Sequence, residues 1–408
     1  MGSSVETWQL RAQFAAGLSS MYGAEVPAYH TLVEVSGLVN AEYASSHAQR
    51  LGSLERVTAE RHGAIRVGNV RELTQVADLF SAFGMHPVGY YDLREAASPV
   101  PVVSTAFRPT DQNELARNPF RVFTSMLASA DERFFSSDLR SRVDTFISSR
   151  ELFDPSLIAQ ARRIAASGGC SDTEASDFVA SAVSAFALSR EPIDHRWYEE
   201  LSAVSAVAAD IAGVTSTHIN HLTPRVLDID ALQRRMTERG ITMIDHIQGP
   251  PRIDGPQVLL RQTSFRALAE PRRFRQSDGA VTDGTLRVRF GEVEQRGVAL
   301  TPLGRQRYDL AMASPDPAAA WQQHFPPTDV EMATAGLAYY VGGDPTKPVV
   351  YEDFLPASAA GIFRSNLDTD AAVSSGTDET HYNLEWMAGQ IGHHIHDPYD
   401  LYEKVACS

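Results

Sequence analysis

The stretch TLRVRFGEVEQRG, residues 285–297, constrains the fold of this chain more than any other segment. If it is a strand, its side chains alternate, so Leu286, Val288 and Phe290 share one face and the arginines between them share the other. The same alternation places Glu292 on the apolar face. A buried carboxylate without a partner is costly, so it must meet a cation, a metal or several hydrogen-bond donors. The segment therefore predicts a β-rich core that encloses a charged site.

Two β-rich segments of similar element order flank a helical segment. Residues 1–60 carry apolar side chains at helical spacing, and residues 61–110 read as a strand, an amphipathic helix and two strands. Residues 111–212, which include NPFRVFTSMLASADERFF, have helical periodicity and predict an inserted helical subdomain. Residues 213–302 repeat the strand–helix–strand order, and residues 303–408 combine helices, a pocket-closing strand and a polar tail. This pattern predicts an α+β fold with a duplicated β-rich module.

Composition disfavours several classes of partner. The net charge of −15 opposes binding to nucleic acid, which needs a basic surface. No apolar run reaches the roughly 18 residues of a membrane-spanning helix, and no secretory signal is visible. Cys170 and Cys407 lie far apart, which favours neither a disulfide framework nor a thiolate metal site. We therefore expect a cytoplasmic protein with a small-molecule substrate and no membrane or nucleic-acid partner.

Histidines on two predicted strands could meet Glu292. His62 in RHGAIRVG shares a strand face with Arg66, whereas in STHINHLTPR the alternation puts His218 and His221 on opposite faces. Two neutral imidazoles and one carboxylate from separate elements form the ligand set of a non-haem Fe(II) site with three open coordination positions. However, 13 histidines and 51 acidic residues yield many such triples. Spacing alone therefore favours ordinary hydrogen-bonded histidines and a surface ion pair, and leaves the metal site as the alternative.

A second group of potential ligands lies in GHHIHDP and comprises His393, His394, His396 and Asp397. Two histidines separated by one residue can bind zinc or copper from one strand face. A polar tail of this kind more often binds no metal. No Gly-x-Gly-x-x-Gly sequence after a strand, phosphate loop or Gly-x-Ser-x-Gly elbow is present. The motifs of nucleotide binding and of serine hydrolases are therefore absent from the sequence.

Several long and unusual blocks give a family resemblance: ERHGAIRVG, GMHPVGYYDL, STAFRP, NPFRVFTS, HINHLTPRVLDID, LLRQTSF, RFGEVEQRGVALTPLGR and VYEDFLPASAAGIFRSNL. On these blocks the sequence resembles the 2-oxoadipate dioxygenase/decarboxylase family, also called hydroxyglutarate synthases, of the vicinal-oxygen-chelate superfamily. The resemblance covers most of the chain. It implies paired βαβββ modules that curl into an open barrel around one metal, with helical additions.

The resemblance also implies roles for individual residues. Family members hold Fe(II) with the histidine of RHGAIR, the second histidine of HINHLTPR and the first glutamate of FGE-x-EQRG, which here are His62, His221 and Glu292. This assignment would explain why a carboxylate points inward from an apolar face. Arg66, the arginine of HGAIR, is implied as a substrate contact, because its planar fork suits a carboxylate.

Further expectations concern the surroundings of these residues. The pair after DFLP, also implied as a substrate contact, is Ala357 and Ser358 where the family pattern has Val-Ser, which enlarges the pocket and leaves the exact substrate open. Glu294 shares the face of Glu292 and is expected to orient a ligand or pair with Arg296. The remaining expectations are a structural hydrogen bond for His218, a pocket wall or ordinary strand positions for Gln262, Thr263 and Ser264, and a helix-surface position for His30.

The activity that the resemblance implies is Fe(II)-dependent conversion of 2-oxoadipate and dioxygen into 2-hydroxyglutarate and CO₂. Oxidative decarboxylation and hydroxylation then occur on the same molecule, and lysine breakdown is the metabolic context. Two alternatives stay open. One is the same iron chemistry on a different 2-oxo acid, which the alanine at position 357 motivates. The other is a non-oxidative, metal-dependent member of the superfamily, because one architecture can host several chemistries.

Overall fold

The computed structural model describes residues 4–44, 50–96, 99–287, 289–355 and 382–408, and it has the α+β architecture that the sequence predicts. Its largest sheet has five strands in the order β3-β4-β5-β2-β8. These strands are β2 (Arg61–Val67), β3 (His86–Asp92), β4 (Val102–Arg108), β5 (Arg121–Leu127) and β8 (His221–Pro224). Strand β2 pairs in parallel with β5 and antiparallel with β8. The two strands that carry predicted histidine ligands are therefore neighbours.

A βαβββ module and a second module of similar element order build the β-rich core. The first consists of β2, helix α5 (Val70–Ser81), β3, β4 and β5. The second consists of β8, α12 (Ile229–Glu238), β9 (Leu260–Phe265) and β12 (Gly291–Arg296), with a hairpin of β10 (Glu270–Arg275) and β11 (Val281–Leu286) before β12. Strand β12 pairs with β9, and an isolated bridge between Arg225 and Glu294 joins it to the end of β8. The described strands form no closed barrel, and the paired modules confirm the predicted fold class.

The structure differs from the sequence predictions at two strands. The helix predicted for NPFRVFTSMLASADERFF is wrong at β5, whose seven residues are all buried between β4 and β2. Its apolar residues Val122, Phe123, Met126 and Leu127 fall at helical spacing, and a strand that is buried on both faces lacks the polar–apolar alternation. The sheet of the first module thus extends beyond residue 110, while the domain boundaries drawn from the sequence stay predictions.

The second difference lies in the stretch 285–297, which is not one continuous strand. Leu286 ends β11, which pairs with β10, whereas Gly291 begins β12, which pairs with β9. The alternation that brings Glu292 and Glu294 to one face therefore holds within β12, and not from Leu286 onward.

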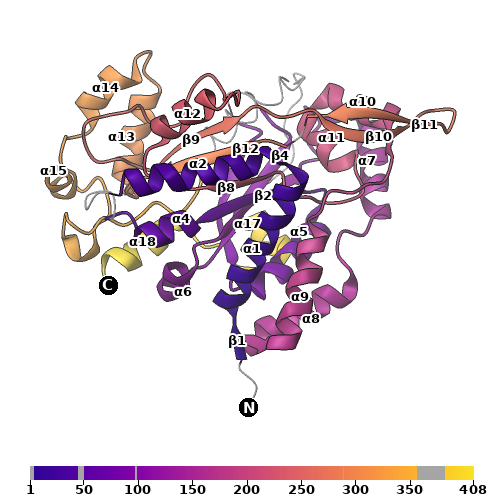
Figure 1. Cartoon of the computed structure of the whole chain (residues 1–408), viewed down its shortest axis with the longest axis horizontal. Coiled ribbons are helices and arrows are strands. Elements are labelled where there is room, and N and C mark those ends of the chain that lie inside the picture. Colours follow the sequence, from indigo (N-terminus) through magenta and orange to yellow (C-terminus); the bar gives the residue numbers. More distant parts are fainter. Residues whose placement is uncertain (1–3, 45–49, 97–98, 288, 356–381) are drawn as a thin grey trace.

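Helices surround the two modules (Figure 1). The N-terminal helix α1 (Thr7–Glu25) buries Leu10, Phe14 and Leu18 at intervals of four residues, which is the spacing of one helix face. Phe14 stacks on Phe83 at a centroid distance of 4.4 Å and so joins α1 to the core around α5. The other helices up to β8 are α2 (Ala28–Glu42), α4 (Leu54–Ala59), α6 (Gln112–Arg117), α7 (Ser137–Ser149), α8 (Pro155–Ser167), α9 (Asp172–Ala185), α10 (His195–Val204) and α11 (Ala206–Ala212).

The C-terminal part forms a further core beside the second module. Its elements are α13 (Pro302–Met312), α14 (Pro317–His324), α15 (Asp329–Thr334), the 3₁₀ turn η1 (Val341–Gly343) and α18 (Pro398–Ala406). Helix α17 (Leu384–Ile391) instead packs against α5 in the core of the first module. In Figure 1, α13 to α15 lie at the opposite end of the molecule from the β10–β11 hairpin. Two short sheets complete the fold: β1 (Ser4–Glu6) with β6 (Gly169–Ser171), and β7 (Ile193–Asp194) beside β10.

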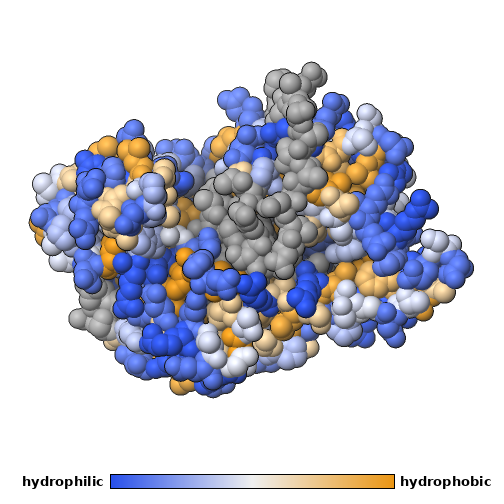
Figure 2. Space-filling view, turned by 90° about the horizontal axis from the view of Figure 1, so that it is seen from above, coloured by the Kyte–Doolittle hydropathy of each residue, from blue (hydrophilic) through white to orange (hydrophobic). Residues whose placement is uncertain are grey.

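The outer surface mixes polar and apolar residues. Figure 2 shows hydrophilic residues interspersed with small hydrophobic areas over the face that it presents. In the part of the chain that the structure describes, no helix combines the length and the apolar character needed to cross a bilayer.

Candidate metal centre

His62, His221 and Glu292 come from three neighbouring strands and meet inside the protein. All three are buried, and each offers one ligand atom within 4.8 Å of the others. The imidazole rings of the two histidines lie 5.3 Å apart, at an angle of 84°. Glu292 Oε1 is 3.4 Å from His62 Nε2, and Glu292 Oε2 is 3.5 Å from His221 Nδ1. The structure therefore brings together the three residues that the family resemblance implies as ligands.

Two glycines allow the strands to approach this closely. A Cβ atom at Gly291, directly before Glu292, would lie 1.8 Å from Cε1 of Phe265 on the paired strand β9. A Cβ atom at Gly63, directly after His62, would lie 2.9 Å from Cδ1 of Ile219. The glycines in FGE and RHG thus serve the packing of the strands that carry the ligands.

The surroundings of His221 fit a bound metal. Both of its ring nitrogens are buried and have no hydrogen-bond partner among the described residues. Burial lowers the pKa of His221 to about 4, against the opposing effect of Glu292, so the imidazole is neutral at pH 7. Buried polar atoms normally have a partner, and a metal ion would supply one. Two imidazoles and one carboxylate suit a first-row divalent metal.

His62 differs from His221 because carboxylates face both of its nitrogens. Its Nδ1 lies 2.8 Å from Oε2 of Glu294, and its Nε2 faces Glu292. Burial lowers the pKa of His62, but the carboxylates of Glu294 and Glu292 outweigh burial and hold the pKa above its ordinary value.

Glu294 leads from His62 into a buried network of ion pairs. Its two oxygens accept hydrogen bonds from Arg296 at 2.6 and 2.9 Å, and Arg121 lies 3.4 Å away. Burial raises the pKa of Glu294, but Arg296, His62 and Arg121 bring it down to about 2. The ion pair of Glu294 with Arg296 that the sequence predicts is confirmed. Arg121 also pairs with Glu60 at 2.8 Å.

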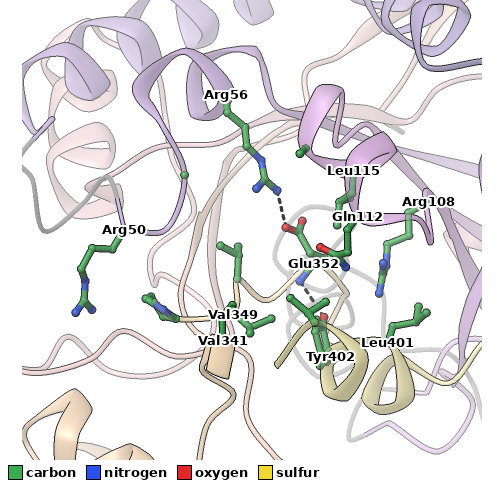
Figure 3. A pocket seen from close by; sticks show the side chains of 15 residues that line it. Arg50, Arg56, Arg108, Gln112, Leu115, Val341, Val349, Glu352, Leu401 and Tyr402 are labelled. Atoms are coloured by element: carbon green, nitrogen blue, oxygen red, sulfur yellow. Dashed lines mark hydrogen bonds and ion pairs between the residues drawn. The ribbon is translucent and has the colours of Figure 1, made fainter. Parts of the chain in front are cut away.

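The outer end of this network borders a cavity of 280 Å³ (Figure 3). There Glu352 accepts hydrogen bonds from Arg121 and from Arg56, the latter at 2.5 Å. The backbone N–H of Glu352 donates to the hydroxyl of Tyr402 at 2.9 Å. The C-terminal helix α18 is thereby linked through Glu352 and Arg121 to the network behind His62.

Asp353, beside this cavity, predicts how stability changes in acid. It accepts hydrogen bonds from Arg108 at 2.7 and 3.0 Å and from Tyr402. Burial raises its pKa, but Arg108 outweighs burial and holds the pKa below the ordinary value. The folded state therefore gains stability above the unfolded pKa of about 4 and loses this gain as the pH falls below it. Chemical denaturation between pH 5 and pH 2 should show a smaller loss of unfolding free energy in Asp353→Asn than in the wild type. Equal losses would contradict this assignment.

Arg66 lies four residues after His62 in β2 and therefore on the same strand face. It is buried, and its guanidinium donates to a carboxylate oxygen of Asp210 on α11. Asp210 also accepts a hydrogen bond from Asn220 at 2.9 Å and lies 3.3 Å from His218 Nε2. His218 is thus part of a hydrogen-bonded group, as the sequence predicts. Asp210 is a residue that the sequence reasoning missed, since it lies in an alanine-rich helix without a motif.

Aromatic rings enclose the histidines. The ring of Phe354 lies 5.0 Å from His62 and 5.0 Å from Phe123, and Phe290 lies 5.4 Å from His221. These apolar walls exclude water from the immediate surroundings of the two imidazoles and strengthen the electrostatic interactions there.

The other residues singled out from the sequence have different positions. Gln262 donates a hydrogen bond to Glu292 Oε1, whereas the Thr263 hydroxyl points to Gln233 on α12. His30 is exposed on α2, as predicted. Ala357 and Ser358 lie outside the described residues.

The histidines of GHHIHDP do not assemble a second metal site. Among the described residues, His62, His221 and Glu292 are the one group of three whose ligand atoms come within 4.8 Å of one another. The backbone of His396 instead pairs with strand β3, with hydrogen bonds to Pro87 and Gly89. Asp397 caps helix α18 by accepting from the N–H of Tyr399 at 2.7 Å.

Known proteins resemble this chain along nearly its whole length. A family model described as 2-oxoadipate dioxygenase/decarboxylase matches residues 14–366. Proteins of that name from Mycobacterium tuberculosis and Escherichia coli are 73% identical over 404 residues and 38% identical over 448 residues. The alignments cover 98% of this chain and 97% of the first relative, and 99% of this chain and 98% of the second. The crystal structure of the hydroxyglutarate synthase from Pseudomonas putida in complex with 2-oxoadipate matches with a TM-score of 0.83 at 36% identity, covering 100% of this chain and 97% of that one.

Proposed function

Because this chain belongs to the 2-oxoadipate dioxygenase/decarboxylase family, we propose that it converts 2-oxoadipate and dioxygen into 2-hydroxyglutarate and CO₂. The observation that carries the proposal is the buried group of His62, His221 and Glu292 in a chain with this family membership. The reaction balances without a second 2-oxo acid. One carboxyl carbon leaves as CO₂, and both atoms of dioxygen enter the five-carbon product, one in its new carboxyl group and one in its hydroxyl group.

Fe(II) is the metal that we propose for this site, with His62, His221 and Glu292 as its protein ligands. Bound there, Fe(II) would supply the electrons for the reduction of dioxygen. The neutral imidazole of His221 supports this choice, because it can bind a cation without first losing a proton. Glu292 is buried beside it and offers a carboxylate oxygen.

Arg66 is the residue that we propose to bind a carboxylate of the substrate. Its guanidinium is buried on the face that carries His62, and five N–H donors allow it to hold a second carboxylate beside Asp210. Asp210 fixes one edge of the guanidinium, so its orientation does not have to be established when the substrate binds. The implied contacts of Ala357 and Ser358 with the substrate also stay part of this proposal.

A test of Arg66 is its replacement by lysine, which keeps the charge and removes the planar fork. We expect KM for 2-oxoadipate to rise about 10- to 100-fold, the equivalent of losing one charge-assisted hydrogen bond. Arg61→Lys, at the start of the same strand, is the matched control, because its guanidinium bonds to backbone oxygens of Thr58 and Glu60. Steady-state kinetics of the Fe(II)-loaded variants measure both. An unchanged KM in Arg66→Lys would remove Arg66 from the substrate site.

The proposed substrate is tested with a panel of 2-oxo acids. Fe(II)-loaded protein is incubated aerobically with short acidic, long acidic, aliphatic and aromatic 2-oxo acids, and the products are identified by mass. We expect 2-oxoadipate to give the highest kcat/KM and 2-hydroxyglutarate as the product. A higher kcat/KM for another 2-oxo acid would favour the same chemistry on a different substrate. Formation of product in an anaerobic incubation would favour a non-oxidative reaction.

A further inference from the structure

We propose that Glu294 is a positioning residue that orients the imidazole of His62 towards the metal, and that this contact sets the strength of metal binding. This inference rests on the proposed function, since it assumes that His62 is a metal ligand. It goes beyond it by assigning a task to a carboxylate that is not itself one of the three proposed ligands.

Each ring nitrogen of His62 faces a carboxylate. Glu294 Oε2 lies 2.8 Å from Nδ1, while Nε2 faces Glu292 Oε1 at 3.4 Å. A proton on Nδ1 would point at Glu294, and the lone pair of Nε2 would then point into the proposed metal site. Metal-binding histidines commonly donate their second ring N–H to a carboxylate, which fixes the tautomer and the ring orientation.

Both carboxylates that face His62 lie on strand β12. Residues two apart in a strand point to the same side, so β12 presents Glu292 and Glu294 to His62 together. The strand is held in this register by its pairing with β9 and by the bridge between Glu294 and Arg225. The proposed ligand and the proposed positioning group therefore cannot move independently of each other.

Glu294 is a charged side chain that ion pairs hold in place. Arg296 donates two hydrogen bonds to it, at 2.6 and 2.9 Å, and Arg121 lies 3.4 Å from its Oε1. The side chains of Glu294 and His62 are each only 1% exposed. A carboxylate held in this way is a rigid acceptor, since neither rotation nor solvent competes with its contact to Nδ1.

The two histidines differ in the carboxylates that contact them. Among the described residues, His221 has one carboxylate within ion-pair distance, that of Glu292, whereas His62 has those of both Glu292 and Glu294. Of the two imidazoles, His62 is the one that the surrounding side chains hold in place. In the part of the chain that the structure describes, Glu294 is the one carboxylate outside the triad within ion-pair distance of a proposed ligand, and its removal would take this contact away.

A purely structural role for Glu294 makes a different prediction, and Glu72 provides the comparison. Glu72 is a fully buried glutamate that pairs with Arg150 through two hydrogen bonds of 2.9 Å, much as Glu294 pairs with Arg296. It lies on α5 and contacts none of the three proposed ligands in the described structure. Replacing either glutamate leaves a buried arginine without its carboxylate, so both changes should lower stability.

The test compares the full-length variants Glu294→Gln and Glu72→Gln with the wild type. Binding of Fe(II) and of Co(II) to the metal-free proteins is measured anaerobically by calorimetry, and thermal unfolding records stability. For Glu294→Gln we expect about 10- to 100-fold weaker metal binding and altered absorption bands of the Co(II) form. For Glu72→Gln we expect lower stability with unchanged metal affinity. Unchanged affinity in Glu294→Gln, or equal losses in both variants, would overturn the positioning role.

A second measurement serves if Glu294→Gln does not fold. ¹⁵N NMR of the histidine side chains in the metal-free wild type reports which ring nitrogen carries the proton. We expect His62 to be protonated at Nδ1, whereas an Nδ1 without a proton would contradict the inference. The proposed function fails separately: it fails if the wild type binds no metal, or if His221→Ala binds metal as tightly as the wild type.

Discussion

Alanine at position 62, 221 or 292 is expected to abolish metal-dependent turnover of 2-oxoadipate. Each replacement removes one of three ligand groups that lie within 4.8 Å of one another in the protein interior. A bound metal contributes several kcal/mol to such a reaction, so its loss corresponds to about a thousandfold or more in rate. Turnover and metal content of the purified His62→Ala, His221→Ala and Glu292→Ala variants, after anaerobic Fe(II) reconstitution, measure this effect.

His246→Ala is the matched control for the histidine variants, because His246 is exposed in the loop before β9. It should bind metal and turn over like the wild type. Full activity in any one of the three triad variants would show that the ligand assignment is wrong. Normal metal content with lost activity would leave the residue in the active site but remove it from the ligand set.

Of the replacements described, Glu60→Gln is expected to cause the largest loss in the free energy of unfolding. Glu60 is fully buried and accepts from Arg121 at 2.8 Å and from Arg225 at 2.9 Å, with Arg296 at 3.5 Å. A neutral amide would leave these guanidinium groups buried without their shared counter-charge. Breaking a buried ion pair by removing one partner lowers the free energy of unfolding by about 3 to 5 kcal/mol.

Urea denaturation of the metal-free proteins measures this loss, with Glu55→Gln as the control. Glu55 is exposed in the helix α4 that leads to Glu60, and its replacement should change the free energy of unfolding by less than about 0.5 kcal/mol. Similar values for both variants would mean that the arginines are satisfied without Glu60. The ion network would then not contribute to stability in the way that its contacts indicate.

The sequence could predict the proposed ligands because they lie on strands with a clear pattern. In β12 the alternation places Glu292 inward, and in β2 it places His62 and Arg66 on one face. The choice of His221 over His218 depended on the family resemblance, because alternation alone separates the two without ranking them. The competing group in GHHIHDP shows the limit of spacing, since His396 pairs through its backbone with β3 and Asp397 caps helix α18.

Other features were hidden because single-sequence patterns do not report long-range pairing. Strand β5 is buried on both faces, so its polar and apolar residues do not alternate. No sequence motif marks Arg121 and Arg225 as buried residues, although both pair with Glu60 in the interior. Asp210 could not be connected with Arg66, from which 144 residues separate it. The composition of a segment gives no sign of such partners.

The measurement that tests the central claim most directly follows the fate of ¹⁸O₂ during a reaction of the Fe(II)-loaded protein with 2-oxoadipate. The account predicts that dioxygen is consumed and CO₂ released in equal amounts, and that ¹⁸O appears in both the carboxyl and the hydroxyl group of 2-hydroxyglutarate. The His221→Ala variant should give neither gas exchange nor product. Formation of CO₂ without uptake of dioxygen, or a product without ¹⁸O, would contradict the claim that this protein is an oxygenase.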